Sequence, residues 1–121
     1  MKTSSAKAKG RVLQKYIRDK ILEAFPNLTD RDVRSTPMGV TGEDITLSEL
    51  GSRQFPYSVE AKNQEKIQIW GALKEAESNN RKLTPLLVFK RNHSKVYCCL
   101  DFDDFIKIVK LTKTIHKNQK I

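Results

Sequence analysis

FPYSVEAKNQ, residues 55–64, is the stretch that decides the fold we expect of this chain. Between residues 57 and 62, polar side chains alternate with apolar or small ones, and this alternation predicts a half-buried β-strand. Successive side chains of a strand point to opposite faces, so one face of this strand can pack on a helix. The other face would display a carboxylate and an ammonium group roughly 7 Å apart. This polar face carries Ser58, Glu60 and Lys62.

The Glu-x-Lys spacing on this face has two interpretations. One is a solvent-facing ion pair, which contributes well under about 1 kcal/mol to stability. The other is a metal site, because the preceding predicted strand opens with GEDI, residues 42–45. Asp44 would lie beside Glu60 if these two strands pair as a hairpin, whereas Glu43 would point to the opposite side. Gly42 suits a place where a phosphate backbone comes close.

A pair of carboxylates at this place could bind a divalent cation. Asp44, Glu60 and the backbone carbonyl of Ala61 form the hard oxygen set that Mg²⁺ prefers, with waters completing the shell. One of these waters could attack a phosphorus atom. The amine of Lys62 could then assist deprotonation or offset the developing negative charge.

The rest of the chain predicts helices on either side of a sheet. Apolar residues recur at helical spacing over residues 9–25, 64–78 and 103–116, and strands are expected at residues 33–35, 44–48, 57–62, 85–89 and 95–101. The order is therefore αβββαββα. It predicts an α/β fold with a mixed central sheet of about five strands flanked by helices.

The length and composition are those of one globular domain, residues 1–121, with basic flexible tails at about 1–8 and 115–121. Cys98 and Cys99 are adjacent, so they are expected on a strand in a reducing compartment rather than in a zinc site. No apolar run has the length of a membrane helix, and the first residues lack the apolar centre of a signal peptide. We therefore expect a cytoplasmic protein without a membrane partner.

The charge of the chain indicates a polyanionic partner. Twenty-three Lys and Arg against fourteen Asp and Glu leave a net charge of +9, with the excess near the two ends. Nucleic acid is the commonest partner of such a surface. A merely solubilising surface is the alternative. No glycine-rich phosphate loop or nucleophile elbow indicates a small-molecule substrate.

GEDI followed by VEAK resembles the Asp…Glu-x-Lys signature of the PD-(D/E)XK nuclease superfamily, and the element order resembles its restriction-endonuclease-like core. The resemblance covers about residues 9–89. AKGRVLQKYIRDKI, residues 8–21, is similar to the opening of archaeal Holliday junction resolvases and of small phage-encoded relatives. The helix of those proteins bears an acidic residue where this chain has Gln14, which can also be interpreted as a surface glutamine.

The resemblance implies a DNA endonuclease that uses Mg²⁺, for which Mn²⁺ can substitute. Asp44, Glu60 and the Ala61 carbonyl would be the metal ligands, and Lys62 and Gln14 would complete the catalytic set. The implied substrate is a Holliday junction or other branched DNA in recombination, repair or phage DNA processing. The implied assembly is a homodimer in the cytoplasm, which would be that of the host if a phage encodes the chain.

Helix 64–78 carries Gln68 and Glu75 on one side, either near the site or simply solvated. We expect phosphate contacts from Lys9, Arg11, Lys15, Ser35, Thr36 and Thr41. A restriction enzyme with a fixed recognition sequence is disfavoured, because no extra segment remains to read base edges. The main alternative is a catalytically silent DNA-binding accessory protein on the same fold.

Overall fold

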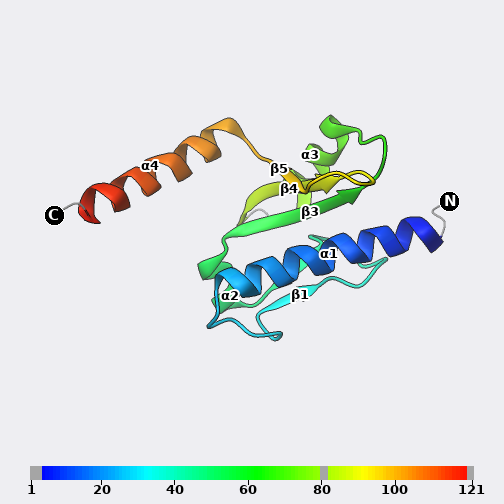
Figure 1. Ribbon diagram of the computed structural model, residues 1–121, viewed down its shortest axis with the longest axis horizontal. Helices are drawn as coiled ribbons and strands as arrows, with labels where there is room; N and C mark the ends of the chain where they lie inside the picture. Colours follow the sequence, from blue (N-terminus) through cyan, green and yellow to red (C-terminus); the bar gives the residue numbers. More distant parts are fainter. Residues whose placement is uncertain (1–3, 80–81, 120–121) are drawn as a thin grey trace.

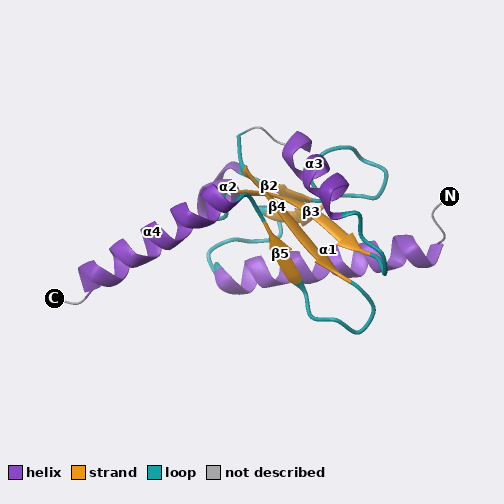
Figure 2. Cartoon of the chain, turned by 90° about the horizontal axis from the view of Figure 1, so that it is seen from above, coloured by secondary structure: helices purple, strands orange, loops and turns teal. Residues whose placement is uncertain are grey.

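The computed structural model describes residues 4–79 and 82–119, and in this part of the chain five strands form two sheets. β1 (Val33–Ser35) pairs antiparallel with β2 (Ile45–Leu47). The larger sheet has the order β3-β4-β5 and contains β3 (Tyr57–Asn63), β4 (Thr84–Lys90) and β5 (Tyr97–Cys99). β3 and β4 are parallel, whereas β4 and β5 are antiparallel (Figure 2). The expected mixed α/β class is confirmed.

Two helices cover opposite faces of the larger sheet (Figure 1). α1 (Ser4–Ala24) lies on one face, and α3 (Ile69–Asn79) lies on the other. This arrangement follows from the alternation in β3, because Val59 faces α1 whereas Glu60 bonds to a side chain of α3. A short helix, α2 (Glu49–Gln54), joins β2 to β3, and α4 (Phe102–Gln119) follows β5.

The hydrophobic core lies under α1 and joins the two sheets. The apolar stripe of α1 contacts both β1 and β3. Buried members of this core are Leu13, Ile17, Ile21, Leu28, Val33, Ile45, Val59 and Val88. Their spacing along α1 follows the helical period, so the stripe seen in the sequence is the buried face of the helix.

The expectation of one central sheet is wrong, because β2 and β3 do not form a ladder. Their link is a backbone hydrogen bond of 2.8 Å from the N–H of Asp44 to the carbonyl of Val59. The element order also differs from αβββαββα, because α2 lies between β2 and β3 where the sequence suggested only a polar connection.

The helix α2 forms because its first turn is capped. The Ser48 hydroxyl accepts from the N–H of Gly51 at 3.0 Å and donates to a carboxylate oxygen of Asp32 at 2.8 Å. Gly51 lies against the turn before β1, and a Cβ atom there would come within 2.5 Å of the carbonyl oxygen of Asp32. A residue without a side chain is therefore required at this contact.

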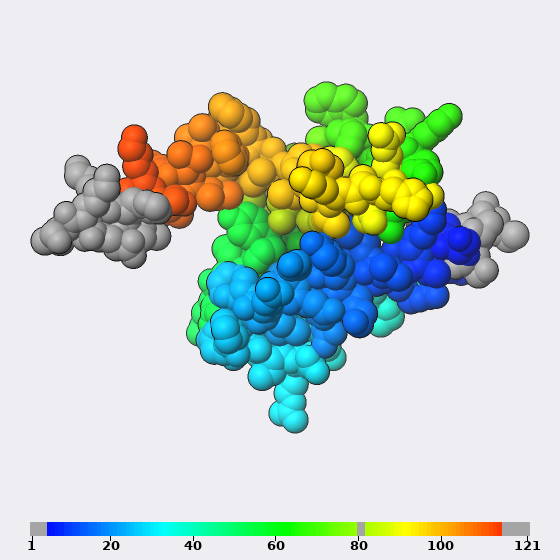
Figure 3. Space-filling model, in the orientation of Figure 1, coloured from blue at the N-terminus to red at the C-terminus, as the bar shows by residue number. Residues whose placement is uncertain are grey.

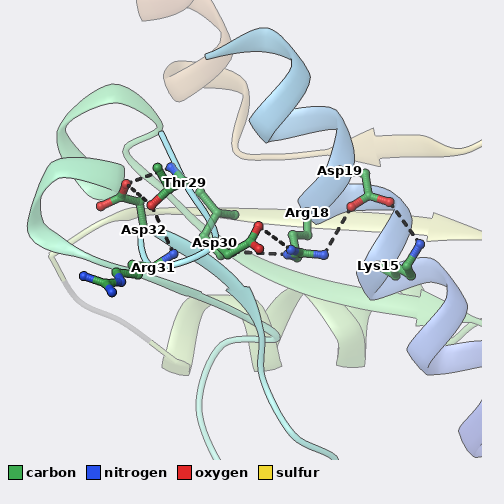
Figure 4. A network of polar contacts seen from close by, with 8 residues as sticks. Lys15, Arg18, Asp19, Thr29, Asp30, Arg31 and Asp32 are labelled. Atoms are coloured by element: carbon green, nitrogen blue, oxygen red, sulfur yellow. Dashed lines mark hydrogen bonds and ion pairs between the residues drawn. The ribbon is translucent and has the colours of Figure 1, made fainter. Parts of the chain in front are cut away.

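Polar contacts also join α1 to the turn that precedes β1 (Figure 4). The guanidinium group of Arg18 donates to Asp30 at 2.6 Å and to the carbonyl of Val33 at 3.3 Å. In the same network Lys15 pairs with Asp19 at 3.4 Å, one turn further along α1. These contacts orient the start of β1 relative to α1.

The helical ends extend further than the sequence suggested. α1 begins at Ser4 and α4 continues to Gln119, so most of the residues assigned to tails at 1–8 and 115–121 are helical. Residues 1–3 and 120–121 lie outside the described part. Within the described part, no helix is both long enough and apolar enough to cross a membrane.

Candidate metal and phosphate site

Asp44 lies at the free edge of β3. Its N–H donates to the carbonyl of Val59, and its Oδ2 atom accepts from the N–H of Ala61 at 2.6 Å. Its carbonyl accepts from the N–H of Thr36 at 2.9 Å, which ties the residue to the end of β1. These three bonds hold Asp44 next to β3 without a strand ladder.

Glu60 is buried on the face of β3 that α3 covers, with 6% of the residue exposed. Its Oε1 atom accepts a hydrogen bond of 2.6 Å from the side-chain amide of Asn79 on α3. Its Oε2 atom lies 3.5 Å from Nζ of Lys62. Lys62 also donates to both carboxylate oxygens of Glu75 at 3.2 Å, so α3 supplies a partner to each group.

A cavity of about 200 Å³ opens where α1, the segment after β1, the edge of β3 and α3 meet. Four of the side chains that the sequence singled out line it together with Glu75 of α3. These four are Gln14, Asp44, Glu60 and Lys62. The structure therefore brings the proposed acids, amine and amide into one place.

The carbonyl of Ala61 points to the same edge of β3 as Asp44. In an extended strand the N–H and C=O of one residue point to the same side, and the N–H of Ala61 bonds to Asp44. The carbonyl of Val59 bonds to Asp44 from that side as well. The Asp44 carboxylate and the Ala61 carbonyl thus lie at the free edge of the strand, and the Glu60 carboxylate lines the same cavity from the face under α3.

The two carboxylates lie close enough to perturb each other. Burial, followed by the charge of Asp44, raises the pKa of Glu60 to about 7, although the Asn79 amide and Lys62 oppose the shift. Burial also raises the pKa of Asp44, and the Ala61 N–H and Lys62 partly offset this rise. At neutral pH the pair therefore retains part of a proton unless a cation neutralises it.

Lys62 remains a cation in this environment. Burial lowers its pKa, but the hydrogen bond from Lys62 to Glu75 and the charges of Glu60 and Glu75 outweigh burial, so the net shift is upward. Lys62 therefore supplies positive charge beside the two carboxylates and is unsuited to act as a free base near neutral pH.

The donor set fits a hard divalent cation such as Mg²⁺ or Mn²⁺. Among residues 4–79 and 82–119, no group of three or more His, Cys, Asp or Glu side chains is placed to hold a metal ion. Mg²⁺ commonly uses only one or two carboxylates and keeps several waters. Asp44, Glu60 and the Ala61 carbonyl match this requirement in chemistry and number.

Gln14 is buried rather than on the surface, with 5% of the residue exposed. Its Oε1 atom accepts from the hydroxyl of Ser35 at 2.7 Å. The interpretation of Gln14 as a surface glutamine is therefore wrong. Its side chain instead lines the cavity from the α1 side.

Two of the expected DNA contacts have roles inside the protein. The residue Thr36 is buried, and its hydroxyl bonds to the Glu43 carbonyl at 2.8 Å and the Thr46 hydroxyl at 2.7 Å. Ser35 donates to Gln14. The hydroxyls of Thr36 and Ser35 are thus both engaged within the protein.

The remaining expected DNA contacts are not fully buried. Arg11, Lys15 and Thr41 are exposed, and Lys9 is half-buried. Lys15 is paired with Asp19 (Figure 4). On the α3 side, Glu75 lines the cavity, whereas Gln68 is exposed, precedes the helix and does not line it.

The sequence reasoning missed two polar residues at the site. Asn79 bonds to Glu60, and its position four residues after Glu75, one helical turn away, was the signal that could have revealed it. Asn63 lines the cavity and donates to the Lys9 carbonyl at 3.0 Å. Its buried Oδ1 atom has no hydrogen-bond partner in the described part of the chain.

Comparisons with protein-family models, with curated proteins and with solved structures found no match to this chain. The resemblance to the PD-(D/E)XK nucleases therefore depends on the motif residues.

Proposed function

We propose that this protein is a metal-dependent endonuclease that hydrolyses DNA phosphodiester bonds at the site formed by Asp44, Glu60 and Lys62. The observation that carries the proposal is the burial of Glu60 beside Asp44 and Lys62 in one cavity. An ion pair that only decorates the surface would be exposed to solvent, whereas carboxylates with perturbed pKa values in a cavity are typical of functional sites. Branched DNA, such as a Holliday junction, is the substrate class we propose.

Asp44, Glu60 and the carbonyl of Ala61 would hold Mg²⁺ or Mn²⁺. The bound ion would lower the pKa of a water and polarise the scissile phosphate. The residues of the chain have three further roles. The two acids would position the cation beside β3. Lys62 would offset negative charge on the phosphate, and Gln14 would present an amide instead of a further anionic ligand.

The electrostatics of the cavity support a cation as its ligand. Two carboxylates with raised pKa values are costly to ionise together, and a divalent ion removes this cost when it binds. The N-terminal half of α1 borders the same cavity with Lys7, and Arg11 lies on the next turn. These cations would attract the phosphates of DNA toward the acids.

The second candidate is a DNA-binding accessory protein that does not cut. Two features of the site support it. Lys62 is held by Glu75 at 3.2 Å as well as lying near Glu60, and Gln14 replaces an acid. Such a protein would keep the basic surface and the salt dependence of DNA binding without hydrolysis.

A nicking assay separates the two functions. Purified protein would be incubated with linear, flapped and four-way DNA in Mg²⁺, in Mn²⁺ and in chelator. We expect cleavage that requires the divalent ion and that falls by a factor of about 10²–10³ in Asp44→Asn, Glu60→Gln and Lys62→Ala.

Matched controls lie on the solvent-exposed side of α3. Glu77→Gln and Lys74→Ala make the same chemical changes at exposed positions, so both should cleave as the unmodified protein does. Binding of branched DNA without cleavage in either metal would refute the enzyme and support the accessory protein. Uniform cutting of different sequences would exclude a fixed recognition site.

A further inference from the structure

The last helix carries an apolar stripe that the protein does not cover. Phe102, Phe105 and Val109 follow one another at helical spacing and are 71%, 46% and 43% exposed. Ile106 flanks the stripe, and Lys107 lies on the opposite side of the helix. A stripe of this kind on a helix normally faces a core. Here α4 projects from the body of the molecule (Figure 3).

The body of the protein has an open apolar groove that none of the helices in the described residues fills. It lies between the second half of α1 and the strands β4 and β5, and its volume is about 280 Å³. Its walls include Ile17, Ile21, Phe25, Leu86, Val88 and Val96. Cys98 of β5 also lines it and is exposed. One chain thus has both an apolar helix face and an apolar groove.

The total surface of the chain is larger than a compact monomer of this mass would expose. The accessible area is 9089 Å². A folded monomer of 13.9 kDa is expected to expose about 6,700 Å². The excess of about 2,400 Å² is at the upper end of the roughly 1,000–2,500 Å² that each chain of an obligate homodimer buries.

A capped first turn directs α4 away from the groove. Asp101 caps the helix, because its Oδ1 atom accepts from the N–H groups of Asp103 at 2.8 Å and Asp104 at 3.2 Å. Only Leu100 and Asp101 separate β5 from the helix. Both views show α4 extending away from α1 and the larger sheet (Figures 1 and 2). A second copy is therefore the better source of a helix for the groove.

We propose that two copies of this chain form a two-fold dimer in which α4 of each copy packs into the α1/β4/β5 groove of the other. Because the exchange is reciprocal, it covers both stripes and both grooves and closes the assembly. The inference does not depend on the nuclease proposal. The sequence resemblance implied a homodimer, whereas this inference names the surfaces that meet.

The charge of the chain gives the dimer a characteristic response to salt. Two chains that each carry +9 repel one another, and added salt screens that repulsion. The apolar contact between stripe and groove is not weakened by this screening. Dimerisation should therefore strengthen with salt, whereas DNA binding should weaken with salt.

The first test measures the mass of the full-length protein by light scattering and sedimentation, without DNA and over a range of protein and salt concentrations. We expect twice the chain mass of 13.9 kDa. The double variant Phe105→Gln, Val109→Gln should shift toward monomer by at least tenfold in the dissociation constant. The matched variant Lys107→Gln, Thr114→Gln places the same residues on the opposite side of the helix and should remain dimeric.

The second test uses the native thiol of Cys98. In a Cys99→Ser background, Val109→Cys should form a disulfide-linked dimer under mild oxidation, whereas Lys107→Cys and the background alone should form much less. A monomeric protein at every concentration would overturn the proposal. So would a dimer that the stripe variant leaves unchanged, or a disulfide within one chain, which would place α4 on its own groove.

Discussion

The N–H of Ala61 donates a hydrogen bond of 2.6 Å to Oδ2 of Asp44, and this contact positions one acid of the site against the strand that carries the other. Asp44 itself lies just before β2, and β2 does not pair with β3. The approach of Asp44 to Glu60 therefore depends on the segment between β1 and β2. Substitutions in that segment can separate the acids while leaving the sheets intact.

Glu60→Gln should stabilise the metal-free protein at high pH. The pKa of Glu60 rises from an ordinary 4.5 to about 7, so the folded state holds this proton more tightly than the unfolded chain does. Ionising Glu60 therefore destabilises the folded state. This loss of stability is absent below about pH 4.5, grows as the pH rises to about 7 and is complete above it. We expect the variant to gain about 1–3 kcal/mol near pH 8 and little near pH 5, as measured by urea denaturation. An equal gain at both pH values would contradict this assignment.

A divalent cation should stabilise the unmodified protein and raise its melting temperature at about pH 8. The reason is that the cation binds the folded pair of carboxylates and relieves the repulsion between Asp44 and Glu60. Thermal unfolding with Mn²⁺ and with chelator measures the effect. Glu60→Gln should lose most of the shift, whereas Glu77→Gln should retain it. If Mn²⁺ raised the melting temperature of Glu60→Gln as much as that of the unmodified protein, the cation would bind at another site.

Asn79→Ala should raise the pKa of Glu60 further. The Asn79 amide donates to the charged form of Glu60 at 2.6 Å and therefore favours ionisation. We expect the side-chain carbon signal of Glu60 in NMR to titrate at a higher pKa in the variant than in the unmodified protein. Ser78→Ala, one residue away on the exposed side of α3, should leave the titration unchanged. A downward shift would show that Asn79 does not stabilise the carboxylate.

Gly51→Ala should destabilise the fold even though alanine favours helices. The new methyl group would come within 2.5 Å of the Asp32 carbonyl oxygen, so α2 or the turn before β1 must move. We expect a loss of about 1–3 kcal/mol in the free energy of unfolding. Gly71→Ala on α3 is the matched control. Its nearest neighbour would be 3.9 Å away, and the change should stabilise the protein by about 0.5–1 kcal/mol.

Arg11→Gln should weaken DNA binding and reduce its salt dependence. Loss of one phosphate contact should lower the slope of log affinity against log salt by about 0.9. Thr36→Val should leave the affinity unchanged, because the hydroxyl bonds inside the protein, and should lower stability by about 1 kcal/mol. Fluorescence anisotropy over a salt series measures both. If Thr36→Val lost as much affinity for DNA as Arg11→Gln, Thr36 would be part of the DNA-binding surface.

Local patterns in the sequence were sufficient to predict the longer helices and strands. The apolar stripe through Leu13, Ile17 and Ile21 predicted α1, and the alternation around Glu60 predicted β3 with one face able to pack on a helix. Both signals are periodic over several residues, so they do not depend on which other segments lie nearby. The short helix α2 was missed because six residues are too few to show a period, and its cap uses Asp32, far back in the chain.

The candidate site divides in the same way. The sequence by itself determined that Glu60 and Lys62 share a face of one strand, because alternation is a local property of extended backbone. Only the tertiary structure decided that the Asp44 carboxylate accepts from the N–H of Ala61 on this strand, that Gln14 is buried against Ser35 and that Asn79 binds Glu60. These contacts join residues 17 to 21 positions apart, and their formation depends on how whole helices and strands pack rather than on any local pattern.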